Sequence, residues 1–161
     1  MNVIAILLLL AATKTAPAPD PEIPNIQATV YAMLNVISGP AGRRDWNRMK
    51  DLFVPGGLMI SARKDGPNVM TPDQYIERVK PIFDQEGFFE RPVVNKIEHY
   101  GNIAHVFCTY ESRHNSNDAK PFARGINSIQ LLNDGKRWYV VTIFWDSERP
   151  DNPIPTKYLP K

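Results

Sequence analysis

The sequence predicts an α+β domain in which helices gather on one face of a curved antiparallel sheet. Apolar residues recur at helical spacing up to about residue 83, whereas after residue 87 they follow the two-residue period of β-strands. Asp134-Gly135 lies between two strand-like runs, and this dipeptide is a strong hairpin signal. Helices followed by a run of antiparallel strands are typical of an α+β fold.

Local signals place the elements of the first half. The apolar stripe of the first helix stops before Gly39-Pro40, which ends a helix. Asp45 and Thr71-Pro72 are suited to the starts of the next two helices. The expected elements are helices over 25–37, 46–53 and 72–83, a strand over 58–63 and a turn over 64–67.

Four strands are expected after residue 87, and they form an antiparallel meander. The polar stretch 114–119 separates the second strand from the third, and Asp134-Gly135 joins the last two. The expected strands cover 88–100, 103–113, 122–132 and 137–146.

The composition is that of an ordinary globular protein. A length of 161 residues suits one domain. Hydrophobic residues at 43% and charged residues at 22% exclude a wholly disordered chain, a collagen and a coiled coil. The net charge of +2 is too balanced for a nucleic-acid partner. The single cysteine, Cys108, excludes an internal disulfide and a multi-cysteine zinc site.

The two ends differ from the body between them. Dense proline before residue 25 and after residue 149 indicates extended chain. The apolar run over residues 3–12 is too short for a stable membrane span, which needs ~20 residues, and has the length of a signal-peptide core. The alternatives are a lipid-facing anchor or a buried N-terminal element. We expect a signal peptide over 1–16, a Pro-rich linker over 17–24, the folded domain over 25–148 and an extended tail over 149–161, with export to the periplasm or outside the cell.

Strand register predicts which side chains share a pocket. If Asp134-Gly135 is a two-residue turn, Arg124 pairs with Trp145 and Ser128 falls on the same face. Tyr110 on the preceding strand joins them. Arg124 either holds an anionic or carbonyl group or forms a structural ion pair. A slip of one residue would exchange the two faces of the sheet.

Three segments resemble the nuclear transport factor 2-like (SnoaL-like) superfamily. They are DWNRMKDLFVPGGLMIS at 45–61, GNIAHVFCTYESR at 101–113 and FARGINSIQLLNDGKRWYVVTIFWDSE at 122–148. The resemblance implies a cystatin-like α+β cone, in which the sheet wraps around helices and encloses a pocket, and commonly a homodimer through the outer face. The superfamily contains ketosteroid isomerases, polyketide cyclases, dehydratases and many binding proteins without catalytic activity, so fold alone does not choose a function.

Matching the chain to the isomerase pattern leaves the catalytic carboxyl groups without counterparts. The pattern's pocket tryptophan matches Trp145, and its oxyanion tyrosine matches Tyr31. Ser128 stands at the place of the protonated aspartic acid, and the general base falls near Ser61 or Ala62. A serine at its ordinary pKa does not remove a proton next to a carbonyl. Isomerase chemistry of that kind is therefore not expected.

The sequence as a whole predicts a domain that binds a small, partly apolar ligand with a carbonyl or anionic group. The alternatives are a cyclase-, dehydratase- or isomerase-like enzyme, with an acid–base pair drawn from Tyr31, Asp45, Tyr110 and Asp146, and a protein-interaction module that uses the outer sheet face. No metal site and no cofactor are expected, since their motifs are absent. The expected pocket residues are Tyr31, Trp46, Tyr75, Tyr110, Arg124, Ser128 and Trp145.

Overall fold

The computed structural model describes residues 20–161. The expected signal peptide and the first part of the linker lie outside the described residues. The elements in chain order are α1 (Ile23–Ile37), α2 (Trp46–Asp51), β1 (Phe53–Ser61), β2 (Asn68–Met70), α3 (Pro72–Phe83), β3 (Phe89–Tyr100), β4 (Ile103–Arg113), β5 (Ala123–Asn133), β6 (Trp138–Ser147) and a short 3₁₀ turn (Thr156–Tyr158).

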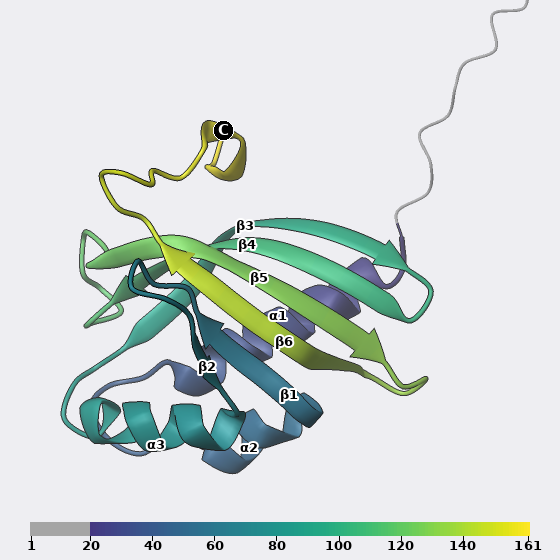
Figure 1. Cartoon of the computed structure of the whole chain (residues 1–161), viewed down its shortest axis with the longest axis horizontal. Helices are drawn as coiled ribbons and strands as arrows, with labels where there is room; N and C mark the ends of the chain where they lie inside the picture. Colours follow the sequence, from purple (N-terminus) through teal and green to yellow (C-terminus); the bar gives the residue numbers. More distant parts are fainter. Residues whose placement is uncertain (1–19) are drawn as a thin grey trace, which may run out of the picture.

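Six strands form one curved sheet in the order β2-β1-β6-β5-β4-β3. Neighbouring strands are antiparallel except β1 and β6, which are parallel. The three helices lie on one side of the sheet and the C-terminal segment lies on the other (Figure 1). The predicted α+β class, with a curved sheet around helices, is confirmed.

The end of α1, the start of α2 and both ends of α3 lie where their local signals predict, whereas α1 begins two residues earlier than expected. Asp45 caps α2 by accepting a hydrogen bond from the backbone of Arg48. At the start of α3, Thr71 and Gln74 form a reciprocal capping box. The second helix ends two residues earlier than expected because Phe53 already belongs to β1. Strand β2 was not expected from the sequence.

The hairpin between β5 and β6 has a different register from the predicted one. Asp134 Oδ1 accepts hydrogen bonds from the backbone N–H groups of Lys136 (2.8 Å) and Arg137 (3.0 Å). This side-chain capping holds a four-residue loop, so Asn133 pairs with Trp138. A β-bulge follows at Val141, since Leu131 pairs with Val140 but Gln130 pairs with Thr142.

The bulge changes which side chains share the helix-facing side of the sheet. Trp145 pairs with Asn127, and Asn127 also pairs with Cys108 of β4. Ser128 pairs with Phe144 on the outer side. The predicted register is therefore wrong for β5: its Asn127 faces the helices, and its Arg124 and Ser128 face away from them.

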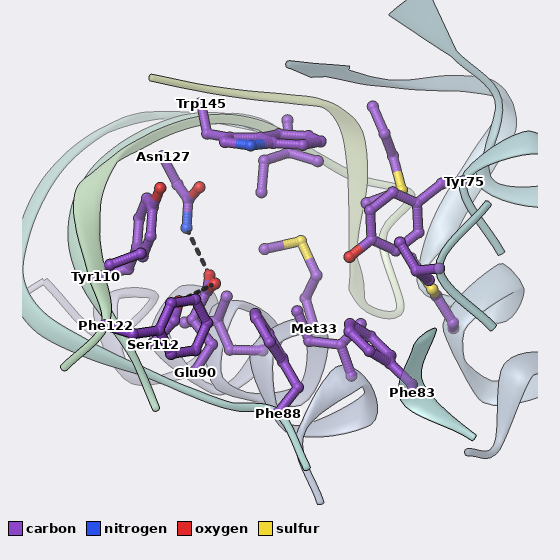
Figure 2. Close-up of a pocket in the computed structure, with 17 residues that line it drawn as sticks. Met33, Tyr75, Phe83, Phe88, Glu90, Tyr110, Ser112, Phe122, Asn127 and Trp145 are labelled. Atoms are coloured by element: carbon purple, nitrogen blue, oxygen red, sulfur yellow. Dashed lines mark hydrogen bonds between the residues drawn. The ribbon is translucent and has the colours of Figure 1, made fainter. Parts of the chain in front are cut away.

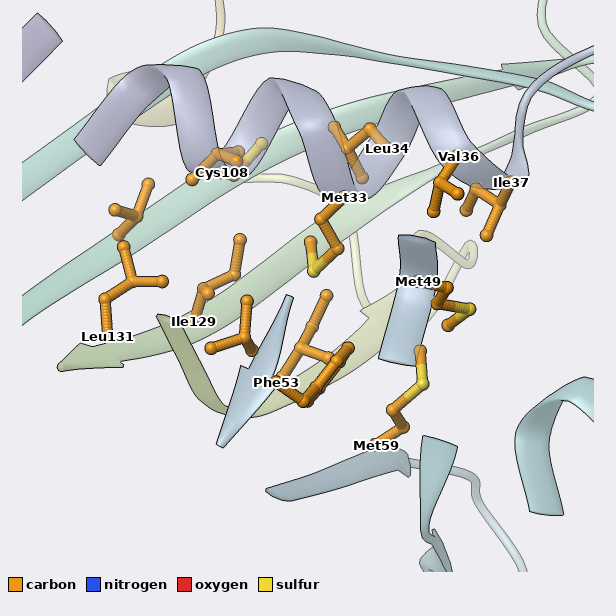
Figure 3. Packing of buried hydrophobic residues seen from close by; sticks show 14 of the residues in the cluster. Met33, Leu34, Val36, Ile37, Met49, Phe53, Met59, Cys108, Ile129 and Leu131 are labelled. Atoms are coloured by element: carbon orange, nitrogen blue, oxygen red, sulfur yellow. The ribbon is translucent and has the colours of Figure 1, made fainter. Parts of the chain in front are cut away.

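The hydrophobic core lies between α1 and the concave side of the sheet. Ile26, Val30 and Leu34 form one stripe of α1 and are almost completely buried. Figure 3 shows Met33 between this helix and the side chains of Ile129 and Phe53. The start of α1 is held against the sheet by Trp138, whose indole N–H donates to Glu22 (2.8 Å).

The C-terminal segment covers one part of the outer sheet face. Thr109 Oγ1 donates a hydrogen bond to the backbone carbonyl of Tyr158 (2.7 Å), and the rings of Phe107 and Tyr158 lie 4.9 Å apart. Ile154 is buried at the same place. Across residues 20–161, no helix has the length and apolar character needed to cross a membrane.

Candidate functional site: a cavity inside the cone

A cavity of about 260 Å³ lies between the helices and the concave face of the sheet. Its volume is near the lower end of ligand pockets, which occupy ~300–1,000 Å³. The lining is mostly aliphatic and aromatic, with a few polar groups among them, as is usual for small-molecule sites. The lining residues are Met33, Leu34, Ile37, Met49, Met59, Tyr75, Val79, Phe83, Phe88, Glu90, Tyr110, Ser112, Phe122, Ala123, Asn127, Ile143 and Trp145.

Glu90 of β3 brings a carboxyl group to this apolar lining. Ser112 is its cross-strand partner on β4, and the Ser112 hydroxyl donates to Glu90 Oε2 (3.0 Å). The Asn127 amide donates to Glu90 Oε1 (3.1 Å). Both hydrogen bonds are drawn in Figure 2. The backbone of Glu90 is also held, since its N–H donates to Ser38 Oγ (2.9 Å). Residues of β4 and β5 thus hold the carboxyl, and the residue that ends α1 holds the backbone of Glu90.

Burial changes the acidity of this group. Removal from water raises the pKa of Glu90 from 4.5 to about 7, while the hydrogen bonds from Asn127 and Ser112 stabilise the charged form and limit the rise. Glu90 is not fully enclosed by the protein, and it lines the cavity. Near neutral pH the carboxyl is therefore present in both protonation states. Perturbed carboxyls in pockets are typical of functional sites.

Two phenol groups also reach the cavity. Figure 2 shows the Tyr75 hydroxyl pointing into it, and no residue within 20–161 hydrogen-bonds to that hydroxyl. Tyr110 shares a hydrogen bond of 3.2 Å with Ser147. Burial raises the pKa of both phenols, to about 12 for Tyr110. Both hydroxyls therefore stay protonated at neutral pH and are able to donate a hydrogen bond.

The structure brings three of the expected pocket residues together. Tyr75, Tyr110 and Trp145 line the cavity, and the ring of Tyr75 meets that of Trp145 edge-on at 6.2 Å. Trp46 is not part of the lining and packs behind it, with its ring 6.3 Å from that of Phe83.

The other three expected residues lie outside the cavity. Tyr31 is half exposed, because it lies on α1 away from the buried stripe. Arg124 forms an ion pair with Glu148 (2.7 Å), and Ser128 lies 3.1 Å from His105 Nε2. Arg124 and Ser128 face away from the cavity because of the bulge at Val141 and the observed β4–β5 pairing.

Sequence reasoning missed Glu90, Ser112 and Asn127. Ser112 lies two residues beyond Tyr110 on the same strand, so alternation alone places it on the inner face. Glu90 is hidden by a second bulge, at Val93. Counting back from the turn between β3 and β4 without that bulge puts Glu90 opposite Arg113, on the wrong side of the sheet.

The comparisons with known proteins identify the fold. No protein-family model matches the sequence. No curated protein matches it either. Among solved structures, a cystatin-like fold protein of unknown function from Nostoc punctiforme PCC 73102 has a TM-score of 0.62 at 11% identity, over 81% of this chain and 93% of that one. The chain has the NTF2-like (nuclear transport factor 2-like), cystatin-like fold.

Two further NTF2-like structures extend the comparison. An NTF2-like protein of unknown function from Silicibacter pomeroyi DSS-3 has a TM-score of 0.55 at 14% identity, over 79% of this chain and 96% of that one. A candidate dehydratase of the NTF2-like family from Streptomyces avermitilis has a TM-score of 0.62 at 11% identity, over 80% and 97%. At these identities the likeness concerns the fold, so function has to be argued from the cavity.

Proposed function

We propose that the protein binds a small, partly apolar molecule in the cavity of its NTF2-like cone, anchored by Glu90. The observation that carries this proposal is a single carboxyl in a largely aromatic lining, held in position by Ser112 and Asn127. Burying a carboxyl costs stability unless it is well partnered. A ligand that hydrogen-bonds to Glu90 supplies the missing partner.

The cavity offers such a molecule two polar contacts on an apolar surface. Glu90 is one, and the Tyr75 hydroxyl on α3 is the other. The rings of Trp145 and Phe88 supply flat apolar area, which favours a ligand with an aromatic or alicyclic body.

A cavity-filling substitution tests the proposal. Val79→Phe adds bulk to the lining, whereas Val69→Phe adds the same bulk to an exposed position on β2. In a thermal-shift screen of small aromatic alcohols, ketones, amines and acids, we expect compounds that stabilise the wild type and the Val69→Phe variant but not Val79→Phe. A screen in which no compound separates the two variants would contradict binding in this cavity.

Acid–base catalysis of the cyclase or dehydratase kind is the second candidate. A carboxyl with a pKa of about 7 and protonated phenols border the same largely apolar cavity, which supports a proton acceptor beside proton donors. Glu90 replaces the carboxyls expected from the sequence, since Asp45 caps α2 and Asp146 pairs with Arg149. One similar structure is a candidate dehydratase. Once a turned-over compound is found, Glu90→Gln should abolish turnover while binding persists; unchanged turnover would exclude this role.

The outer sheet face supports a proposal about partners. Large apolar residues remain exposed there, among them Ile103, Leu132, Val141 and Phe144. We propose that a second copy of the chain covers them, with a protein of another kind as the alternative. Light scattering across a concentration series tests it. A dimer that Phe144→Glu converts to monomer supports self-association, and a monomer at every concentration contradicts it.

Export is a separate proposal, carried by the apolar run over residues 3–12. The intact mass of the protein isolated from its own source is the test. A mass reduced by roughly the first 12–16 residues supports cleavage, and a full-length mass contradicts it.

A further inference from the structure

We infer that the molecule bound in the cone cavity carries a positive charge, and that an ammonium group on an apolar body pairs with Glu90. This inference rests on the proposed binding function and names the ligand's charge class. It replaces the sequence-based expectation of a carbonyl or anionic group, which depended on Arg124 lining the pocket.

The charges around the cavity have one sign. None of the lining residues is lysine, arginine or histidine, and Glu90 is the only acid among them. Two basic groups close to the lining have partners of their own. Arg44 lies over the Phe83 ring and donates to the backbone carbonyls of Ile37 and Gly39, and Arg113 pairs with Glu111. A negative ligand would have no counter-ion in the lining and would face a carboxylate, which is costly in a largely apolar site.

The hydrogen bonds of Glu90 leave acceptor positions for a ligand. Ser112 and Asn127 each donate to a different carboxyl oxygen, and both stabilise the ionised form. Each oxygen has a further lone pair, so the group that completes the site is a donor. An N–H bond from an ammonium to a carboxylate is about twice as strong as a neutral hydrogen bond.

The aromatic lining suits the same charge. Six rings border the cavity, and Figure 2 shows Trp145 forming one wall, with Phe88 and Phe122 beside Glu90. Ring faces carry partial negative charge and attract cations, tryptophan most strongly. A carboxylate among ring faces attracts an ammonium, while the rings also accept an apolar body. A cavity of about 260 Å³ has room for one aromatic ring with a short chain, since ~150 Å³ holds benzene.

If the ligand is a cation, its affinity should depend on pH through the ionisation of Glu90. The titratable groups around Glu90 are the phenols of Tyr75 and Tyr110 and the thiol of Cys108, and burial raises the pKa of each well above 9. Among the lining residues, only Glu90 therefore changes charge between pH 6 and 8. The ring of His114 stacks on that of the lining residue Phe122, at 4.2 Å, so the Glu90→Gln variant is titrated over the same pH range. With a pKa of about 7, its ionised fraction changes about tenfold over that interval, and the affinity for an amine should follow.

Calorimetric titration of the full chain with three probes of similar size, 4-phenylbutylamine, 4-phenylbutan-1-ol and 4-phenylbutyrate, tests the inference. At pH 8 we expect 4-phenylbutylamine to bind at least ~10-fold more tightly than 4-phenylbutan-1-ol, in line with a charge-assisted bond. The amine should lose about tenfold in affinity at pH 6. Glu90→Gln should abolish the preference, and Arg124→Ala, whose side chain lies outside the cavity, should keep it. The pH series on the wild type needs no variant to fold.

The other possible results distinguish a wrong charge class from a wrong binding function. If the alcohol binds as well as the amine and neither responds to pH, the charge class is wrong while the binding function stands. If 4-phenylbutyrate binds best, the charge class is also wrong. If none of the three probes binds and the Val79→Phe screen is likewise negative, both proposals fail together.

Discussion

The Asn127 side-chain amide donates a 3.1 Å hydrogen bond to Glu90 Oε1, although these residues belong to strands β5 and β3, which are separated by β4. Both side chains stand on the concave face of the sheet, where curvature brings the inner surfaces of separated strands toward each other (Figure 1). The acidity of the cavity's carboxyl therefore depends on a residue two strands away.

Loss of that donor should make Glu90 a weaker acid. In Asn127→Ala the ionised carboxyl loses one stabilising hydrogen bond, so we expect the pKa of Glu90 to rise above about 7. Titration of the glutamate side-chain carboxyl carbons by NMR measures it. Asn102→Ala, in the exposed turn between β3 and β4, is the control and should leave the pKa unchanged. A fall in the pKa on loss of Asn127 would contradict the assigned donor role.

Glu90 should also make stability depend on pH. Its pKa is raised in the folded state from 4.5 to about 7, so the unfolded chain ionises first, and the free energy of unfolding falls as pH rises through this range. At pH 8 the ionised group costs up to about 3 kcal/mol, since each pKa unit corresponds to about 1.4 kcal/mol. Urea unfolding of wild type and Glu90→Gln at pH 5 and pH 8 measures this difference.

The Gln variant should gain relative stability at pH 8 compared with pH 5. Equal differences at both pH values would show that Glu90 titrates normally.

Gly125 provides the space that Tyr110 occupies. A Cβ at Gly125 would lie 2.3 Å from the Asp146 carbonyl oxygen and 2.6 Å from the Tyr110 hydroxyl. Since the first of these atoms is backbone, Gly125→Ala should destabilise the fold by about 1–3 kcal/mol through overpacking. Chemical denaturation measures it, with Gln130→Ala on the outer side of the same strand as the control. A neutral Gly125→Ala would show that β5 and β6 move apart easily.

The C-terminal segment should contribute to stability through Ile154. Its side chain is buried against the outer face, so Ile154→Ala should cost about 2 kcal/mol or more. The same substitution at Ile82, which is half exposed, should change stability by less than about 0.5 kcal/mol. Equal effects at the two isoleucines would mean that the tail is not packed in solution.

Arg124 should contribute little to either stability or binding. Its ion pair with Glu148 is partly exposed, so Arg124→Ala should cost no more than about 1 kcal/mol. Because the guanidinium lies on the side of the sheet away from the cavity, probe affinity should not change. Thermal melts and the amine titration together measure both quantities, and a weakened amine affinity would contradict the observed strand register.

The elements themselves could be predicted from sequence because their causes are local. The stripe of Ile26, Val30 and Leu34 produces α1, and the cap formed by Thr71 starts α3. Alternation along β4 places Tyr110 on the inner face, where the structure has it. The α+β class follows from the same local patterns.

The composition of the cavity was decided by the tertiary structure. The extra residue at Val93 turns Glu90 of β3 into the cavity. The observed pairing of β5 with β4, and with β6 beyond the bulge at Val141, places Asn127 inside the cavity and Arg124 and Ser128 outside it. A bulge depends on how whole strands pack and curve. Pro92 beside the Val93 bulge suits an edge strand equally well, so it does not by itself specify the bulge. The sequence by itself determined the helices, the strands other than β2, and the aromatic lining residues Tyr75, Tyr110 and Trp145. The pairing of strands decided that the one charged group in that lining is an acid.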